Sequence, residues 1–263
     1  MQPTVGSIFD GWRVQARNLH ALMIRDLMMR YGRNNIGFVW FVVEPILLTV
    51  GITCVWLLAG LGQKGGVKVI ELVLTGYLPL TLWRHLTGPF TQIFRRSASL
   101  LYHRRVTLFD VVMSRLLLEF LGATVALILF LGSLIITGAV ETIQSLDYFV
   151  LGWFMMGWIG ITFGILIAAV TEVSETAERF IGPLQYINLP LSGCFIMVDW
   201  LPPTAQKLIM YHPHVHCYEV FRRGYFGEFI PTYYDIPYFV GCAFVFTFLA
   251  LVALVRVRPH VQI

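Results

Sequence analysis

Six long apolar stretches dominate this 263-residue sequence and constrain its fold more than any other feature. A helix needs roughly 20 apolar residues to cross the hydrocarbon core of a bilayer, which is about 30 Å thick. The stretches lie at residues 38–59, 70–94, 113–138, 146–171, 180–198 and 237–256. Only 13% of the residues are charged, about half the usual share of a soluble domain. We therefore predict an all-α polytopic membrane protein with six transmembrane helices in one domain, residues 1–263.

The fifth apolar stretch differs from the others because it contains Pro183, Pro190 and Gly193. Proline removes a backbone N–H donor and clashes with the preceding helical turn. A membrane tolerates such a residue where neighbouring groups satisfy the freed carbonyls. We expect a broken or kinked helix over residues 180–198.

The basic residues indicate how the six helices are oriented. If the N-terminus is cytoplasmic, 13 of the 19 lysines and arginines lie on the cytoplasmic side. Lysine and arginine are retained on that side during insertion, so both termini are predicted to be cytoplasmic. Anionic lipid head groups attract basic residues at this surface, and this topology explains the net charge of +4 without nucleic acid. We expect no cleavable signal peptide, because the N-terminus is charged and long before its first apolar run.

Two segments outside the apolar stretches predict helices at the membrane surface. Residues 10–33 predict an amphipathic interfacial helix, because one helical stripe gathers its large apolar side chains and Arg13 and Arg17 lie on the other side. The stripe consists of Trp12, Ala16, Leu19, Met23 and Leu27. The one long outer segment, residues 197–236, contains several prolines and predicts short helices at or within the outer membrane face.

The sequence contains no GxxxxGK[ST] phosphate-binding motif, so we expect this chain to bind no ATP and no other cofactor. If the protein pumps its substrate, a separate subunit must hydrolyse ATP and contact a cytoplasmic surface of this chain. Residues 95–112 combine arginines with leucine, tyrosine and phenylalanine, which suits such a contact. We call residues 95–112 the coupling segment.

Three segments together carry a resemblance to a known family. They are residues 30–45, which include Gly37-Phe38-Val39-Trp40 and Glu44-Pro45, residues 100–110, and residues 211–227. The chain resembles the permease subunit of polysaccharide-exporting ABC transporters, and most of all the capsular-polysaccharide export branch. The resemblance covers the whole chain in order.

The resemblance implies the type-2 ABC exporter permease fold and a homodimer that binds two copies of an ABC ATPase subunit. ATP and magnesium would bind to that partner, and the permease itself would not be an enzyme. The implied substrate is a lipid-linked polysaccharide that crosses the bacterial inner membrane. Periplasmic and outer-membrane export proteins are further implied partners, and nucleic acid is not.

The resemblance also assigns roles to the two surface segments. The coupling segment transmits the motion of the ATPases, and residues 197–236 form re-entrant helices at a periplasmic gate. We call residues 197–236 the gate segment. Relatives often have a proline near the end of the coupling segment, where this chain has Leu108, so the shape of the loop can differ while its role stays.

Individual residues follow from these roles. The ATPase-coupling candidates are Tyr102, Arg104, Arg105, Leu108, Phe109 and Asp110. The gate candidates are Trp200, His212, His214, His216, Glu219 and Arg222.

Ionisable and aromatic residues inside the predicted spans are the candidates for a substrate path. They are Glu44, Arg84, Trp83, Trp153, Phe154 and Trp158. Lipid exposure of an ionisable group costs at least ~2.5 kcal/mol, so such groups usually face the bundle interior or an aqueous path. An ion pair between Glu44 and Arg84 and a contact of Arg84 with substrate phosphate or acidic sugars remain equal alternatives. For the aromatic rings, ordinary packing is the commoner explanation and sugar stacking the alternative.

His212, His214 and His216 alternate as three imidazoles on one face of a strand would. A zinc site is disfavoured, because no cysteine or carboxylate completes a tetrahedral set and Pro213 interrupts regular structure. We therefore predict no metal site and prefer the gate interpretation for these histidines.

Three further alternatives stay open at this point. Cys194 and Cys217 both fall on the predicted outer side and allow a disulfide. A permease of the same fold could move O-antigen, teichoic acid or a drug instead. An integral-membrane enzyme that uses the histidine-bearing segment is the rival from a different class.

Overall fold

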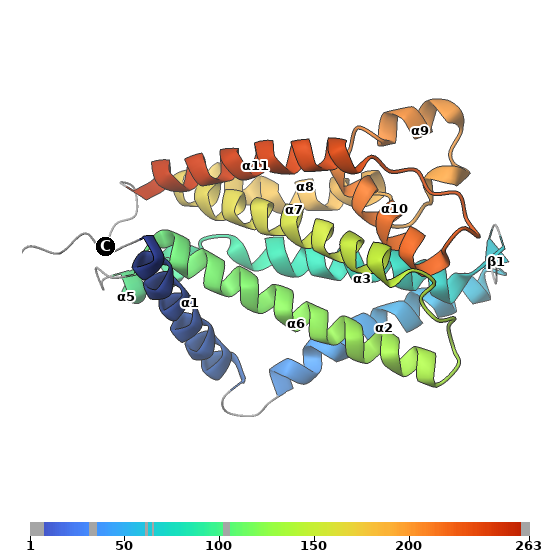
Figure 1. The fold of residues 1–263 in the computed structure, drawn as a ribbon, viewed down its shortest axis with the longest axis horizontal. Coiled ribbons are helices and arrows are strands. Elements are labelled where there is room, and N and C mark those ends of the chain that lie inside the picture. The colour runs from blue at the N-terminus through green and yellow to red at the C-terminus, as the bar shows by residue number, and fades with distance from the viewer. Residues whose placement is uncertain (1–7, 32–35, 61–62, 65, 102–105, 259–263) are drawn as a thin grey trace, which may run out of the picture.

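The computed structural model describes residues 8–31, 36–60, 63–64, 66–101 and 106–258. They form an elongated bundle in which the long helices run roughly along one axis (Figure 1). The helix α1 (Ile8–Tyr31), the short helix α5 (Ala98–Leu101) and the last turns of α11 (Ile236–Val257) lie at one end of the bundle, which we call the terminal end. The hairpin of β1 (Gln63–Lys64) and β2 (Val67–Lys68) and the helix α9 (Pro203–Ile209) lie at the opposite end, which we call the hairpin end.

Helices make up nearly all of the regular structure. The long helices are α1 (Ile8–Tyr31), α2 (Ile36–Leu58), α3 (Val69–Thr87), α6 (Leu108–Ile136), α7 (Leu146–Val173), α8 (Glu175–Leu191) and α11 (Ile236–Val257). The shorter elements are η1 (Gly88–Phe90), α4 (Ile93–Arg96), α5 (Ala98–Leu101), η2 (Val198–Trp200), α9 (Pro203–Ile209) and α10 (Pro213–Phe226). Strands β1 (Gln63–Lys64) and β2 (Val67–Lys68) form a small antiparallel hairpin.

Three helices of the described chain, α6, α7 and α11, are long and apolar enough to cross a membrane. Residues Ile46–Leu58 of α2 form a shorter apolar helical stretch. Helix α3 carries Glu71 and Arg84, and α8 has only 17 residues with charged groups in its first turn. The largely helical membrane fold is thus confirmed, whereas the count of six spans stays a prediction.

The ends of α3 and α8 differ from those predicted from the sequence. Helix α3 stops at Thr87 instead of residue 94, because Pro89 lacks an N–H donor and the chain then turns through Gln92, whose φ is +55°. The sequence predicts a broken or kinked helix over residues 180–198, and the break is wrong, because α8 runs through Pro183 and Pro190 without interruption. It ends instead at Leu191, just before Gly193, whose φ is +81°.

Side-chain caps set the starts of three long helices. Thr107 and Asp110 form a capping box at α6, in which each side chain accepts the other residue's backbone N–H. The Ser174 hydroxyl accepts the N–H of Ala177 at the start of α8. The Asp235 carboxylate accepts the N–H of Tyr238 at 2.9 Å at the start of α11.

Helix α7 packs against α3, α10 and α11 and forms the centre of the bundle. Glycines allow its backbone to approach two of these neighbours closely. A Cβ on Gly152 would lie 2.6 Å from the Cα of Phe221 in α10, and a Cβ on Gly164 would lie 2.4 Å from the carbonyl oxygen of Leu86 in α3. Gly224 of α10 meets the backbone of Phe149 in α7 equally closely. Backbone contact between small residues is a common way in which membrane helices associate.

We expect Gly152→Ala to loosen α10 from α7, because its Cβ has no room against the Phe221 backbone. Overpacking of this kind costs typically 1–3 kcal/mol. Thermal unfolding of the purified protein in detergent should show a lower Tm. Gly241→Ala on α11 is the matched control, because open space surrounds Gly241 and alanine is the better helix former. Equal Tm values for the two variants would contradict this account of the packing.

Candidate functional site

The coupling segment begins with α4 and α5 at the terminal end and continues into the first turn of α6. The Nε of Arg95 lies 3.7 Å from a carboxylate oxygen of Glu172 near the end of α7. The Gln92 amide donates a hydrogen bond to the carboxylate of Glu178 in α8. Acidic side chains near the α7–α8 turn therefore contact Arg95 at the start of the coupling segment and Gln92 just before it. Tyr102, Arg104 and Arg105 lie outside the described residues.

Asp110 is fully buried at the start of α6. Its carboxylate accepts hydrogen bonds from the Thr107 backbone and hydroxyl at 2.9 and 2.8 Å, and from the Gln15 side chain of α1. Leu108 and Phe109 are half-buried and pack against the core. Direct docking of a partner on Asp110 conflicts with this burial. Asp110 instead ties α1 to the end of the coupling segment.

Helix α1 packs on α6 and crosses the bundle obliquely at the terminal end (Figure 1). Leu22 is buried in this contact. Trp12, Met28 and Met29 are exposed, as large apolar side chains on a surface helix would be if they faced lipid. Helix α1 thus combines one packed face with a substantial exposed apolar surface.

Three ionisable side chains from three helices meet inside the bundle. His85 of α3 places Nδ1 3.4 Å from a carboxylate oxygen of Glu119 in α6 and Nε2 4.0 Å from one of Glu44 in α2. Glu119 is completely buried, and the other two are half-buried. The sequence analysis named Glu44 and missed His85. His85 could have been found in the sequence, because it is a second ionisable residue beside Arg84 within a predicted membrane span.

The ion pair between Arg84 and Glu44, one of the two alternatives left open by the sequence, is not formed among the described residues, where Glu44 lies beside His85 instead. The side chain of Arg84 is exposed, and its Nη1 donates a hydrogen bond of 3.4 Å to the Tyr77 hydroxyl. An exposed guanidinium within an apolar helix is costly in lipid, so this face of α3 fits an aqueous or protein environment.

Three of the four aromatic path candidates are packing residues. The indole N–H of Trp153 donates to the Thr124 hydroxyl, and that of Trp158 donates to the Thr247 hydroxyl, both at 3.0 Å. Trp83 is buried against Phe163 and His214. Phe154 is the exception, with 57% of its surface exposed.

Phe154 lines an apolar groove of about 350 Å³ between α6 and α7. The groove is almost free of polar groups, as expected of a surface that contacts lipid tails. Sugar stacking is therefore not favoured at Trp83, Trp153 or Trp158, whose rings are already occupied by the protein.

The gate segment is organised around the guanidinium of Arg222, which is only 1% exposed. Its Nη1 donates to the carbonyl oxygens of Gly193 and Ile196 at 2.8 and 3.1 Å, and Nη2 donates to that of Cys194 at 2.7 Å. These carbonyls follow the end of α8, where no helical N–H satisfies them. Arg222 thereby fastens α10 to the end of α8.

Glu219 completes the same network one helical turn earlier. One of its carboxylate oxygens lies 3.6 Å from Nη1 of Arg222 and accepts the Val198 N–H at 3.4 Å. The other accepts the Tyr233 N–H at 3.0 Å. Burial raises the pKa of the Glu219 carboxyl, although the neighbouring guanidinium opposes this shift. Two predicted gate residues thus join α10, η2 and the chain before α11.

The three histidines do not lie on a strand, which corrects that part of the sequence analysis. His212 directly precedes α10 and makes no side-chain capping hydrogen bond, and His214 and His216 lie in the first turns of α10. The rings of His212 and His214 lie 4.9 Å apart, but His214 and His216 are two residues apart in a helix and point about 200° away from each other, so the three rings do not share one face. His216 contacts Asp235 and Met210, whereas His214 packs on Trp83. No cluster of metal-binding side chains occurs among the described residues.

The structure also decides on the disulfide between Cys194 and Cys217 and shows the position of Trp200. Cys194 and Cys217 are both buried free thiols, so the disulfide is not formed. The Cys194 thiol lies 3.3 Å from the Gly76 carbonyl oxygen of α3 instead. Trp200 lies in η2, half-buried against the core.

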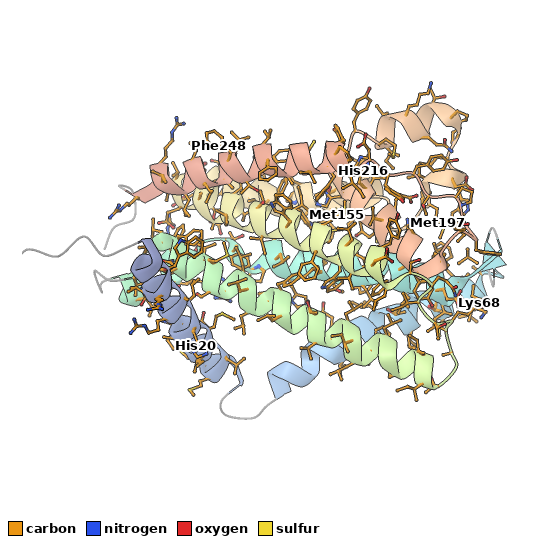
Figure 2. All side chains as sticks on the ribbon, in the orientation of Figure 1. His20, Lys68, Met155, Met197, His216 and Phe248 are labelled. Atoms are coloured by element: carbon orange, nitrogen blue, oxygen red, sulfur yellow. The ribbon has the colours of Figure 1, made fainter. Side chains whose placement is uncertain are left out.

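The two ends of the molecule carry different side chains, as the labelled residues in Figure 2 illustrate. His20 of α1 lies toward the terminal end, and Lys68 of the hairpin lies at the opposite end. Lys68 forms an ion pair of 3.0 Å with Glu141, which raises the pKa of this lysine. The start of α6, with the described coupling candidates Leu108, Phe109 and Asp110, and the gate network lie toward opposite ends of the bundle.

Comparison with known proteins gives one family and a consistent set of relatives. Residues 17–226 match the family described as ABC-2 type transporter. The capsule polysaccharide export inner-membrane protein BexB of Haemophilus influenzae is 36% identical over 227 residues, 86% of each chain. The capsule polysaccharide export inner-membrane protein CtrC of Neisseria meningitidis serogroup B is 34% identical over 256 residues, 97% of each chain. The polysialic acid transport protein KpsM of Escherichia coli is 22% identical over 262 residues.

We expect Arg222→Met to destabilise the protein strongly, because three carbonyls and the Glu219 carboxylate lose their buried cation. Breaking a buried pair in this way costs about 3–5 kcal/mol. Arg223→Met is the matched control. Its ion pair with exposed Glu228 is worth at most about 1 kcal/mol.

Thermal unfolding in detergent and proteolysis within residues 197–236 measure the effect of each substitution. The Arg222 variant should unfold at a lower temperature and be cut faster in this segment. If the two variants behave alike, Arg222 does not hold the gate segment together.

Proposed function

The chain belongs to the ABC-2 type transporter family, and from that premise we propose that it is the permease of an ATP-driven exporter of capsular polysaccharide. The exporter moves a lipid-linked polysaccharide across the bacterial inner membrane. The observation that carries this proposal is the similarity to capsule polysaccharide export inner-membrane proteins over 86% and 97% of the chain. A match over nearly the full length supports the same task as well as the same fold.

A separate ABC ATPase supplies the energy in this proposal, with ATP and magnesium bound to that subunit. The support is the missing phosphate-binding motif and the position of the coupling segment at one end of the bundle. Two copies of the ATPase bind to a permease homodimer. Tyr102, Arg104 and Arg105 contact the ATPase directly, and Leu108, Phe109 and Asp110 position the segment.

The terminal end faces the cytoplasm in this proposal, and the hairpin end faces the periplasm. The basic residues of α1 and of the coupling segment support this orientation, because arginine is retained on the cytoplasmic side. The remaining spans are α2, α3 and α8. Periplasmic and outer-membrane export proteins receive the polysaccharide beyond the hairpin end.

Two exposed surfaces support the homodimer. Helix α8 has no buried residue among those described, and Phe180, Leu184 and Ile187 lie open on it. The exposed Arg84 of α3 also needs a polar neighbour within the membrane. A second copy and a polar substrate path between the two copies would cover both surfaces.

The gate segment contains a re-entrant helix, α10, that opens and closes the periplasmic end of the path in this proposal. Its packing supports a single rigid unit, because Arg222 binds it to α8 and the glycine contacts bind it to α7. Motion that reaches α7 or α8 from the coupling segment would therefore carry α10 with it.

The rival functions have less support. O-antigen, teichoic acid or a drug remains an alternative load for the same fold, but the named relatives favour capsular polysaccharide. An enzyme that uses the histidines is disfavoured, because His214 is buried and both ring nitrogens of His216 are engaged by the backbone.

Deletion of the gene tests the export function directly. We expect the cell-surface polysaccharide to disappear and the polymer to accumulate inside the cell, and a plasmid copy to restore the surface polymer. The tagged permease should co-purify with an ATP-binding subunit from the same cells. Unchanged surface polysaccharide after deletion would contradict the proposal.

We further expect Asp110→Ala to uncouple export from ATP hydrolysis. The substitution removes the acceptor for Gln15 and one half of the capping box, which is worth about 1 kcal/mol at the start of α6. Glycan exported per ATP hydrolysed should fall several-fold while the complex still assembles.

Asp147→Ala is the matched control for this experiment, because Asp147 is exposed in the first turn of α7 at the opposite end. It should leave the ratio unchanged. An Asp110 variant that exports and hydrolyses ATP as the wild type does would show that the α1–α6 link is not part of coupling.

A further inference from the structure

An open pocket of about 440 Å³ lies at the hairpin end, between α9, the start of α10 and the start of α11. Its volume falls in the range of roughly 300–1,000 Å³ that is typical of small-molecule sites. Side chains from four separate segments line it, including Gln206, Lys207, Tyr211, Tyr233, Asp235 and Tyr238. We call it the tyrosine pocket. None of the ATPase-coupling or substrate-path candidates lines it.

The wall of the tyrosine pocket is held by hydrogen bonds around His216, which Figure 2 labels near the start of α11. The Asp235 backbone N–H donates to Nδ1 of His216 at 2.9 Å, so Nδ1 must be the acceptor. Nε2 lies 2.9 Å from the carbonyl oxygen of Met210, so Nε2 must carry the proton. Burial lowers the pKa of His216, which agrees with this neutral imidazole. The two hydrogen bonds therefore favour one tautomer and one orientation of the neutral ring.

Hydrogen bonds also fix the position of the tyrosines that line the tyrosine pocket. The Tyr238 hydroxyl donates to the carbonyl oxygen of Tyr211 at 2.9 Å, and its backbone N–H donates to Oδ1 of Asp235. The Tyr233 backbone N–H donates to the buried Glu219 carboxylate. The Tyr211 side chain is 73% exposed, and those of Tyr233 and Tyr238 are partly exposed. Three tyrosines thus line an open pocket, and the backbone groups that hold them in place are already hydrogen-bonded within the protein.

Polar groups that remain available complement the rings. Oδ2 of Asp235 accepts no hydrogen bond from the described chain, and Lys207 is exposed without an ion pair there. The Gln206 amide nitrogen binds the Leu201 carbonyl, which leaves its oxygen as an acceptor. Carboxylate and amide oxygens accept hydrogen bonds from sugar hydroxyls, aromatic faces cover the apolar faces of sugar rings, and an ammonium pairs with acidic sugars.

We propose that the tyrosine pocket binds a short segment of the exported saccharide where it leaves the membrane. The ligand class is an oligosaccharide, and Lys207 favours one with carboxylate or phosphate groups. This inference rests on the proposed export function and places a glycan contact on the outer side of the gate. Because His216 belongs to α10, an occupied pocket would contact the re-entrant helix itself.

Interfacial tyrosines also occur without a ligand, because their rings suit the lipid head-group region. The binding experiment therefore includes a lipid competitor. Oligosaccharides released from the capsule of the producing strain by mild acid are titrated against the intact permease–ATPase complex in detergent. Glycerophosphoethanolamine is titrated in parallel as a phospholipid head group.

We expect wild-type protein to bind the oligosaccharides and Tyr211→Ala/Tyr233→Ala to weaken that binding at least about tenfold, or ~1.4 kcal/mol. Tyr211→Phe should bind within about threefold of wild type, because it keeps the ring while its carbonyl still accepts from Tyr238. Leu208→Ala is the matched control. It truncates an exposed side chain of α9 that does not line the pocket. Basal ATPase activity and monodisperse elution report that each variant has folded and assembled.

Three outcomes would overturn the inference. Equal oligosaccharide affinity for wild type and the double variant would place binding elsewhere. Binding of glycerophosphoethanolamine with the same dependence on Tyr211 and Tyr233, without saccharide binding, would assign the pocket to lipid. A wild-type complex that exports polysaccharide in cells but binds no oligosaccharide would reject the pocket and leave the export function intact. The gene deletion tests the proposed export function separately from the proposed binding site.

Discussion

The buried guanidinium of Arg222 is the interaction on which the arrangement of the hairpin end depends. A helix that ends away from water leaves carbonyl oxygens without donors, and each unsatisfied group is costly in a medium that offers none. Helix α8 ends at Leu191, and Arg222 donates to the carbonyls of Gly193, Cys194 and Ile196 that follow. One side chain thereby satisfies the carbonyls of the turn that follows α8 and fixes the position of α10. Glu219 extends the same network to η2 and to the chain that enters α11.

Close backbone packing carries this arrangement into the rest of the bundle. Gly152 and Gly224 bring α7 and α10 into backbone contact, and Gly164 brings α7 against α3. A helix held by both side-chain hydrogen bonds and backbone contact moves with its neighbours, because packed interiors deform little. At the terminal end, Asp110 similarly ties α1 to α6. The proposed transporter therefore has rigid connections at both ends, and the long helices join them.

Much of the fold was readable from hydropathy, and the parts that were not have identifiable causes. The apolar stretches at 113–138, 146–171 and 237–256 correspond to α6, α7 and α11 within a few residues at most ends. The end of α3 was missed because Pro89 acts locally inside an apolar run. The continuity of α8 was missed because its prolines looked like helix breakers, whereas the helix passes through both. Composition indicates which segments lie in the membrane, but it does not indicate the residue at which a helix ends.

The sequence by itself determined that this protein lies in a membrane, the family to which it belongs and the kinds of residue at each end. These features can be read from neighbouring residues, because the thickness of the bilayer sets the length of an apolar run and the helical period sets the spacing of apolar side chains. It named Arg222 and Glu219 without revealing their partners. Only the tertiary structure decided that His85 lies between Glu44 and Glu119, and that Trp153 and Trp158 bind threonines. It also decided that Asp110 is buried and that three tyrosines share one pocket. These contacts join residues far apart in the chain, and they depend on the rotation and register of whole helices, which packing among several segments sets together.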